Sequence, residues 1–111
     1  MDLNLVVLKG RPVTEPEIVE FPDGVRFMRM LIAVRSEYPQ QQLDVLAVIW
    51  WNPPEQSGGN RLEPRRATWV VGAMQRRFLD VSDPPRSHVE VVAHAVMSDP
   101  AQAGAMGAIA P

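Results

Sequence analysis

The most regular pattern in the chain is an alternation of apolar and mixed positions over residues 25–36. Successive side chains of a strand point to opposite faces, so this pattern predicts a strand of about ten residues. One face is wholly apolar and is expected to lie in the core: Met28, Met30, Ile32 and Val34. The other face mixes arginines with apolar residues, which suits a surface that holds a polyanion with stacking bases: Phe27, Arg29, Leu31, Ala33 and Arg35.

Four further strands are predicted at residues 3–11, 43–51, 68–78 and 87–97. Pro12, Pro16 and Pro22 make the segment after the first strand unsuited to a helix or a central strand. The sequence Phe-Pro-Asp-Gly at residues 21–24 predicts a turn, and Gly72 inside a strand predicts a bulge or sharp bend. Long strands joined by hairpins favour a sheet that closes on itself and so leaves few exposed edges.

The domain organisation follows from length and from where the pattern ends. With 111 residues the chain is long enough for one core, and we expect one domain over residues 1–98. Residues 52–67 are rich in proline and glycine and allow at most a turn or two of helix, near 54–57 or 60–63. Residues 99–111 show no periodicity and are expected to form a flexible tail.

The order of these elements resembles the bacterial single-stranded DNA-binding protein family over most of residues 1–98. The matching positions begin with Asn4, Val6, Leu8, Gly10, Arg11, Thr14, Glu15, Pro16, Glu17, Gly24, Ile32, Ala33 and Val34. The resemblance implies an all-β fold, a five-stranded oligonucleotide-binding (OB) barrel with Greek-key closure and little helix. Replicative relatives end in an acidic, aromatic-tipped peptide, whereas this chain stops at Ala110 and Pro111. We expect either a shortened chain or a divergent member without that tail, such as a primosomal or accessory barrel.

Charge and composition narrow the function classes. The net charge of −2 does not favour a polyanion as partner, but the charges are segregated, with acids over residues 15–23 and arginines over 26–35 and 61–77. Cysteine is absent, and His88 and His94 are about 20 Å apart on one strand, too far to share a metal ion. No nucleophile or phosphate-loop motif occurs, so we expect no enzyme activity, metal, cofactor or small-molecule substrate. Neither a signal peptide nor a membrane span is predicted, which favours the cytoplasm, in association with the nucleoid.

Aromatic side chains are the first candidates for contact with bases. Trp50 would share a face with Asp44, Leu46 and Val48, and Trp51 would share the smaller, apolar face that resembles a core. We therefore expect Trp50 to be exposed and Trp51 to be buried. By resemblance, Trp50, Tyr38 and Phe78 match positions at which the family presents stacking aromatics. Hydrophobic packing or a subunit interface is the alternative role for each of them. The family often has a further aromatic where this chain has Leu43 and Asp44, and its loss should weaken binding.

Arginines on the same strands are candidates for phosphate contacts: Arg11, Arg29, Arg35, Arg76 and Arg77. The alternative is a solvated surface or ion pairs with acids such as Glu90. The predicted function is therefore sequence-independent binding of single-stranded DNA in replication, recombination or repair. A non-catalytic protein-interaction or primosome-accessory module with weak or no DNA binding remains the alternative. By resemblance, and because residues 3–8 are apolar on both faces, a homo-oligomer is expected, either a dimer or a tetramer.

Overall fold

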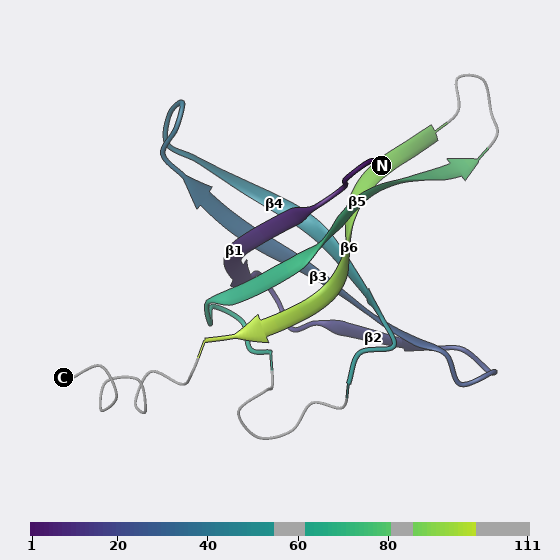
Figure 1. Ribbon diagram of the computed structural model, residues 1–111. Coiled ribbons are helices and arrows are strands. Elements are labelled where there is room, and N and C mark those ends of the chain that lie inside the picture. Colours follow the sequence, from purple (N-terminus) through teal and green to yellow (C-terminus); the bar gives the residue numbers. More distant parts are fainter. Residues whose placement is uncertain (55–61, 81–85, 100–111) are drawn as a thin grey trace.

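The protein is built from β-strands, and no helix occurs in the part of the chain that the computed structural model describes (Figure 1). That part comprises residues 1–54, 62–80 and 86–99, with the backbone alone for 78–80 and 86. The strands are β1 (Val6–Pro12), β2 (Glu17–Glu20), β3 (Arg26–Ser36), β4 (Gln42–Trp51), β5 (Thr68–Asp80) and β6 (Arg86–Ser98). The five predicted strands are therefore found. The predicted helical turn falls mainly on 55–61, and the predicted tail almost wholly on 100–111, outside the described residues.

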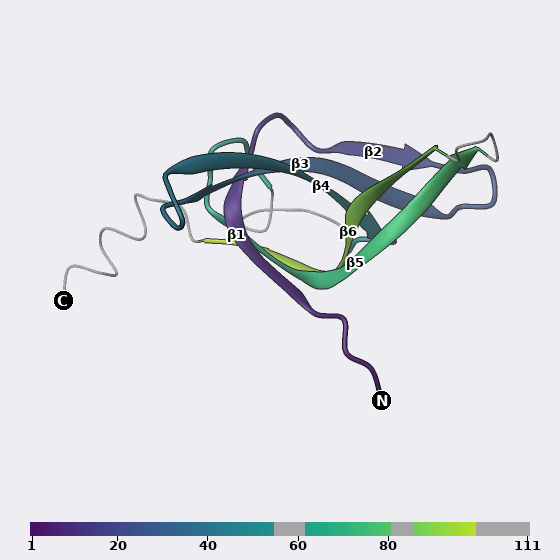
Figure 2. The same cartoon turned by 90° about the horizontal axis from the view of Figure 1, so that it is seen from above.

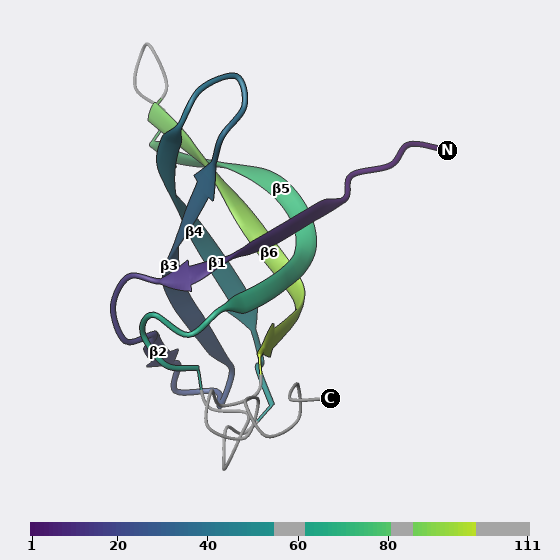
Figure 3. The same ribbon diagram turned by 90° about the vertical axis from the view of Figure 1, so that its left-hand side faces the viewer.

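Five of the strands close into a barrel. The order is β1-β5-β6-β4-β3, and β3 returns to β1 because Arg11 and Pro12 pair with Ala33 and Ile32. Figure 3 shows β1 crossing between β3 and β5. The pairs are antiparallel except for β4 with β6, which run parallel. This closed barrel confirms the predicted OB fold.

Strand β2 was not predicted. It pairs only with β3 and lies at the outer edge of the sheet, and its four residues directly follow Pro16. Because an edge strand needs hydrogen bonds on one side only, a flanking proline does not prevent its formation. The expectation that this segment cannot form a central strand therefore still holds.

The core is filled from the apolar face of β3. Met28, Met30 and Ile32 are each at most 3% exposed, as the alternation predicted. They pack in one cluster with Val48 of β4, and with the other members Trp50, Leu62, Val70, Val91 and Ala93. Such a continuous apolar interior gives the barrel its stability, since each buried large side chain contributes about 1.5–3 kcal/mol. The outer faces of the strands remain available for binding.

Gly72 lies where β5 bends sharply around the barrel. The pairing register between β5 and β6 shifts between Val71 and Gly72, which confirms the predicted bulge. A Cβ atom at this position would overlap the carbonyl oxygen of Val92, so only glycine allows the two backbones to approach this closely. Because of the bend, the first half of β5 belongs to the barrel and the second half extends beyond the barrel.

Beyond the bend, β5 and β6 continue as a long hairpin that projects past the barrel (Figures 1 and 2). We call this part, residues 74–80 and 86–90, the arm. Its position matters for function because the arm rises beside the outer face of β4, where β6 pairs with β4 at Val48 and Ile49. The predicted turn before β3 is also present, since the backbone N–H of Gly24 donates to the carbonyl of Phe21 at 2.9 Å.

Candidate nucleic-acid interface

A groove of about 560 Å³ lies between the outer face of the β3–β4 sheet and the arm. Its floor comes from two neighbouring strands: Arg29 of β3 is paired with Ile49 of β4, and Leu31 with Ala47. Its wall comes from the arm, through Arg77 of β5 and three residues of β6. The residues that define this main groove are Phe27, Arg29, Leu31, Val45, Leu46, Ala47, Ile49, Arg77, His88, Val89 and Glu90.

The floor of the main groove continues into a longer track along β3. The residues at positions 27, 29, 31, 33 and 35 share the outer face, and positions 27 to 35 span about 26 Å of strand. Arg29 and Arg35 are both exposed on it, as the alternation of this strand predicted. Arg11 joins the same face from β1, because it is the register partner of Ala33. Three of the predicted arginines therefore lie along one continuous surface.

The two tryptophans at the end of β4 are placed opposite to the prediction. Trp50 is 8% exposed and belongs to the core, whereas Trp51 is 41% exposed. The pairing with β3 explains the reversal, because Trp50 is opposite the core residue Met28 and Trp51 is opposite Phe27. The prediction that Trp50 lies on the outer surface is wrong, and Trp51 takes that position.

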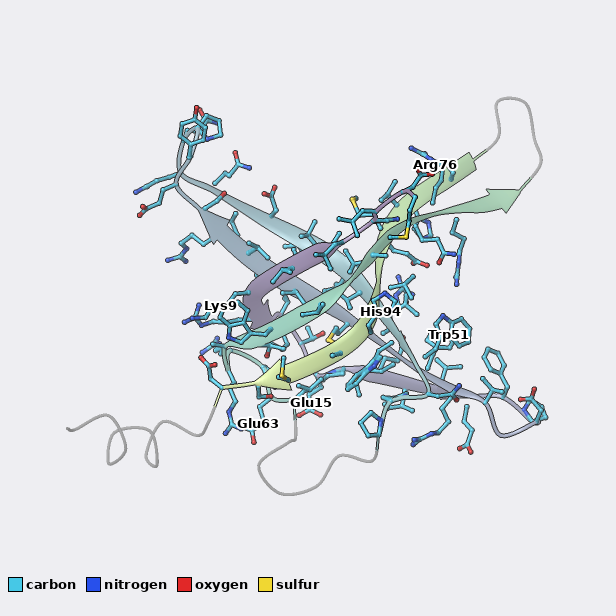
Figure 4. All side chains as sticks on the ribbon, in the orientation of Figure 1. Lys9, Glu15, Trp51, Glu63, Arg76 and His94 are labelled. Carbon is cyan, nitrogen blue, oxygen red and sulfur yellow. The ribbon has the colours of Figure 1, made fainter. Side chains whose placement is uncertain are left out.

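Trp51 and Phe27 form an aromatic pair at one end of the main groove. Their ring centroids are 5.1 Å apart with the planes tilted by 50°, and Phe21 extends the cluster at 5.8 Å from Phe27. Trp51 is labelled in Figure 4, on the side of the barrel where the arm emerges. An exposed aromatic ring close to arginines is a suitable surface on which a base can stack. Phe27 had a clear sequence signal, since the alternation of β3 placed it on the arginine-bearing face.

The two arginines of the arm point to opposite faces. The Nε of Arg77 is 3.4 Å from Glu90 Oε1 in the wall of the main groove. The Nη1 of Arg76 instead donates to Ser87 Oγ at 3.0 Å on the other face of the hairpin. This alternation follows from strand geometry, since neighbouring residues of a strand diverge. Of the predicted pair, the structure brings only Arg77 into the main groove.

Glu90, which the sequence offered as an ion-pair partner for these arginines, lies in the wall of the main groove beside Arg77. Its side chain is 4% exposed, and its two oxygens face Arg77 and His88, with His88 Nε2 at 3.2 Å from Oε2. The geometry to Arg77 is that of an ion pair, since Oε1 has no hydrogen-bond partner among the described residues. A buried carboxylate without full hydrogen bonding is costly, and here it partly offsets the positive charge of the wall.

The other two predicted aromatics belong to the two hairpins that project from the barrel. Tyr38 is 89% exposed in the loop between β3 and β4. The backbone of Phe78 belongs to the arm and pairs with Ser87, but its side chain lies outside the described residues. Both are therefore at the ends of the interface, one at each projecting hairpin.

Within residues 1–54, 62–80 and 86–99, no three His, Cys, Asp or Glu side chains are grouped so that they could hold a metal ion. Among the same residues there is no helix with the length and apolar character needed to cross a membrane.

Comparison of the fold with solved structures gives three informative neighbours. The SSB of Plasmodium falciparum in complex with ssDNA has a TM-score of 0.71 and 16% identity, covering 89% of this chain and 96% of that one. The single-stranded DNA-binding protein of Thermus aquaticus has a TM-score of 0.76 and 19% identity over 91% of this chain and 52% of its own. The dimeric N-terminal domain of PriB from Thermoanaerobacter tencongensis has a TM-score of 0.64 and 19% identity, over 88% and 98% of the two chains. At such identities the likeness concerns the fold.

Sequence comparison identifies the family. No protein-family model matches the chain. Single-stranded DNA-binding protein 3 of Listeria innocua is 30% identical over 99 residues, which are 85% of this chain and 62% of the relative, so the chain spans less than two thirds of it. Single-stranded DNA-binding protein 3 of Clostridium acetobutylicum is also 30% identical, over 85% of this chain and 69% of its own length. With this identity over most of both chains, and with the same barrel, the chain belongs to the single-stranded DNA-binding protein family.

Proposed function

We propose that the protein binds single-stranded DNA without sequence preference along the main groove. The observation that carries the proposal is that Phe27, Arg29 and Arg77 line one groove, with the exposed Trp51 packed against Phe27. Base rings have a π-face whatever their identity, so stacking on Trp51 tolerates any sequence. Arginine contacts to phosphates fix the strand without reading it. Membership of the family and the fold likeness to SSB structures support the same reading.

The proposed contact set differs from the predicted one at two positions, because Arg76 lies on the other face of the arm and is left out. Trp51 replaces Trp50 as the stacking residue, because Trp50 is enclosed in the core. The track along β3 supplies Arg11, Arg29 and Arg35 as phosphate contacts, and Arg77 supplies another from the arm. Tyr38 and Phe78 are proposed as peripheral stacking positions on the two projecting hairpins. Roles in replication, recombination or repair, and an association with the nucleoid, would follow from this binding.

The direct test is a titration of the protein with an oligothymidylate at two salt concentrations. Binding is monitored through the intrinsic tryptophan fluorescence. Stacking on Trp51 should quench its emission, since the ring is exposed before binding. Each phosphate contact on a single strand lowers the slope of log affinity against log salt by about 0.7. With three to four arginines engaged, the expected slope is about −2 to −3.

The arm supplies a matched pair of variants for this test. Arg77→Gln removes a cation from the main groove, whereas Arg76→Gln removes one from the opposite face. We expect Arg77→Gln to make the salt slope shallower by about 0.7 and to weaken all sequences alike. Arg76→Gln should leave the slope close to that of the natural sequence. Equal effects of the two changes would show that the arm contributes only a general electrostatic field.

A second candidate function comes from a different class, a protein-interaction or primosome-accessory module with weak or no DNA binding. The charge balance of the main groove favours it, because Glu90 offsets Arg77, and the floor residues Leu31, Val45 and Ala47 are apolar. The fold likeness to the PriB domain adds to it. Folded protein that shows no single-strand binding even at about 50 mM salt would decide for this alternative, since phosphate contacts are strongest at low salt.

We also propose that the chain forms a homo-oligomer, a dimer or a tetramer. In the described residues, β1 pairs with β5 over positions 6–10 but with β3 only at positions 11 and 12, so one edge of its first half is open. Leu3, Leu5 and Val7 are exposed beside that edge. An open strand edge with apolar flanks is a ready site for pairing with another copy.

A further inference from the structure

A second hollow lies on the outside of the barrel at the end of β1. It has a volume of about 420 Å³, and four cations line it: Lys9, Arg11, Arg65 and Arg66. Asp99 is the single acidic residue in its lining. Figure 4 shows Lys9 and Glu63 on the opposite side of the barrel from Trp51. We call this hollow the second groove.

Two segments distant in the sequence are fixed together to form the second groove. The backbone N–H of Arg65 donates to the carbonyl of Pro12 at 3.1 Å, which ties the turn before β5 to the end of β1. Leu62 anchors the start of that turn in the core, and Thr68 Oγ1 donates to the Arg66 carbonyl at 2.9 Å. The cations are therefore presented on a rigid base, which lowers the entropic cost of binding an anion.

The second groove carries a net positive charge, because its four cations outnumber Asp99 in the lining and Glu63 beside it. Arg66 pairs with the exposed Glu63 at 3.3 Å. For Lys9, Arg11 and Arg65, no ion pair is found within the described part of the chain. Lys9 Nζ instead lies 5.2 Å from the ring centroid of Trp69, which is itself exposed at 38%. Arg65 adopts φ 69°, a left-handed conformation that favours glycine, yet the position carries a long cationic side chain.

The second groove and the main groove share no lining residue, but Arg11 bridges the surface between them. This residue lines the second groove and is the register partner of Ala33, which is two residues from Leu31 on the same face of β3. Two strand residues correspond to about 7 Å, so the gap along the surface is short. One flexible polyanion can follow Arg29, Arg11 and Lys9 without leaving the protein. An acidic protein segment could bind the second groove without reaching the main groove. It would also have no base to stack on the partly exposed ring of Trp69.

We propose that the second groove binds the phosphate backbone of a further segment of the same single strand, after that strand leaves the main groove. This inference rests on the proposed function, because it takes single-stranded DNA to be the occupant of the main groove. It assigns phosphate contacts to Lys9, Arg65 and Arg66, and a stacking position to Trp69. A short strand would occupy the main groove alone, and a longer one would reach both grooves.

The test compares a double variant, Lys9→Gln with Arg65→Gly, with the natural sequence on two oligothymidylates. Their lengths are about 5 and about 16 nucleotides, the ends of the range that one such barrel accommodates. Glycine at position 65 removes the charge and suits the left-handed backbone, so the fold should be retained. The variant should bind the short strand unchanged and the long strand about tenfold more weakly at low salt. Its salt slope for the long strand should be shallower by about 1.4, the value for two lost phosphate contacts.

A charge-preserving variant, Lys9→Arg with Arg65→Lys, is the matched control and should bind both strands like the natural sequence. Thermal melting of each protein confirms that the fold is unchanged. Equal affinity of the natural sequence and the double variant for the long strand would overturn the inference. So would an equal weakening for both lengths, because the cations would then act through a general field. Failure of the natural sequence to bind either strand would overturn the proposed function, and this inference with it.

Discussion

Trp51 is the side chain on which the proposed stacking depends most directly. It is half-exposed and packs against Phe27 at one end of the main groove, whereas Trp50 beside it is enclosed by the core. We expect Trp51→Ala to weaken binding of an oligothymidylate by about 1–3 kcal/mol with little loss of stability. Trp50→Ala should instead lower the free energy of unfolding by about 3–5 kcal/mol, because it leaves a cavity.

Fluorescence anisotropy of a dye-labelled oligothymidylate, which does not depend on Trp51 as the reporter, and urea unfolding of both variants check this pair of expectations. The contrast is informative because the two residues are chemically identical and adjacent, so only their orientation differs. A stable Trp50→Ala protein with impaired binding would show that the faces of β4 are the reverse of those described.

A separate prediction concerns Glu90 and the charge of the main groove. Its buried carboxylate is placed against Arg77 and repels any phosphate that approaches the wall. We expect Glu90→Gln to tighten single-strand binding several-fold at low salt, because Arg77 then contacts a phosphate without a competing carboxylate. In the background of Arg77→Gln, the change at Glu90 should tighten binding much less. Weaker binding of Glu90→Gln in the natural background would instead mean that the ion pair is needed to hold Arg77 in place.

At the level of the strands, the bend of β5 is the feature on which the arm depends. A methyl group at Gly72 would meet the backbone of Val92 and Ala93, which cannot move without breaking the β5–β6 pairing. We expect Gly72→Ala to lower the free energy of unfolding by about 1–3 kcal/mol, as for other overpacked sites. Gly24→Ala is the control: φ there is 90°, but no atom lies within 4 Å of the added carbon. It should cost only about 1 kcal/mol, from backbone strain alone. Urea unfolding of both variants separates steric overlap from conformational strain.

The strands differ in how far their orientation could be predicted from sequence. In β3 the two faces differ in polarity, so the alternation alone assigned the core residues and the outward arginines correctly. In β4 both faces are apolar over residues 45–51, and periodicity carries no information about orientation there. The deciding fact is the register, in which Ser36 pairs with Gln42 and Met28 therefore meets Trp50. The loop between β3 and β4 sets that register. The sequence of the loop does not specify at which residues the pairing on its two sides begins.

The same limit applies to the candidate site. Arg29 and Arg35 could be placed from one strand, because their face was known. The meeting of Arg77 with Glu90 could not, since it depends on pairing between β5 and β6 across a hairpin. The second groove depends on a contact between the turn at Arg65 and the end of β1, segments more than fifty positions apart. Contacts of this kind are products of the closed barrel and leave no local signal in the sequence.

For the molecule as a whole, the open edge of β1 is the feature with the largest consequence. Asn4 continues along β5, since its side-chain amide exchanges two hydrogen bonds with the backbone of Met74, at 2.8 and 3.0 Å. The first residues then extend away from the barrel (Figures 2 and 3), with Leu3, Leu5 and Val7 exposed. Solvent exposure of apolar side chains beside an open strand edge is unfavourable, so burial against a second copy would stabilise this end of the chain.

We therefore expect light scattering at micromolar concentration to give a mass of at least twice the 12.4 kDa of one chain. The double variant Leu5→Glu with Val7→Glu should shift the mass toward that of one chain, because paired edges would bring the new carboxylates together. Val13→Glu with Ile18→Glu introduces the same charges at exposed apolar positions away from this edge, and should leave the assembly intact. A natural sequence that scatters as a single chain would refute the oligomer. A control pair that dissociates as readily as the first would place the interface elsewhere on the barrel.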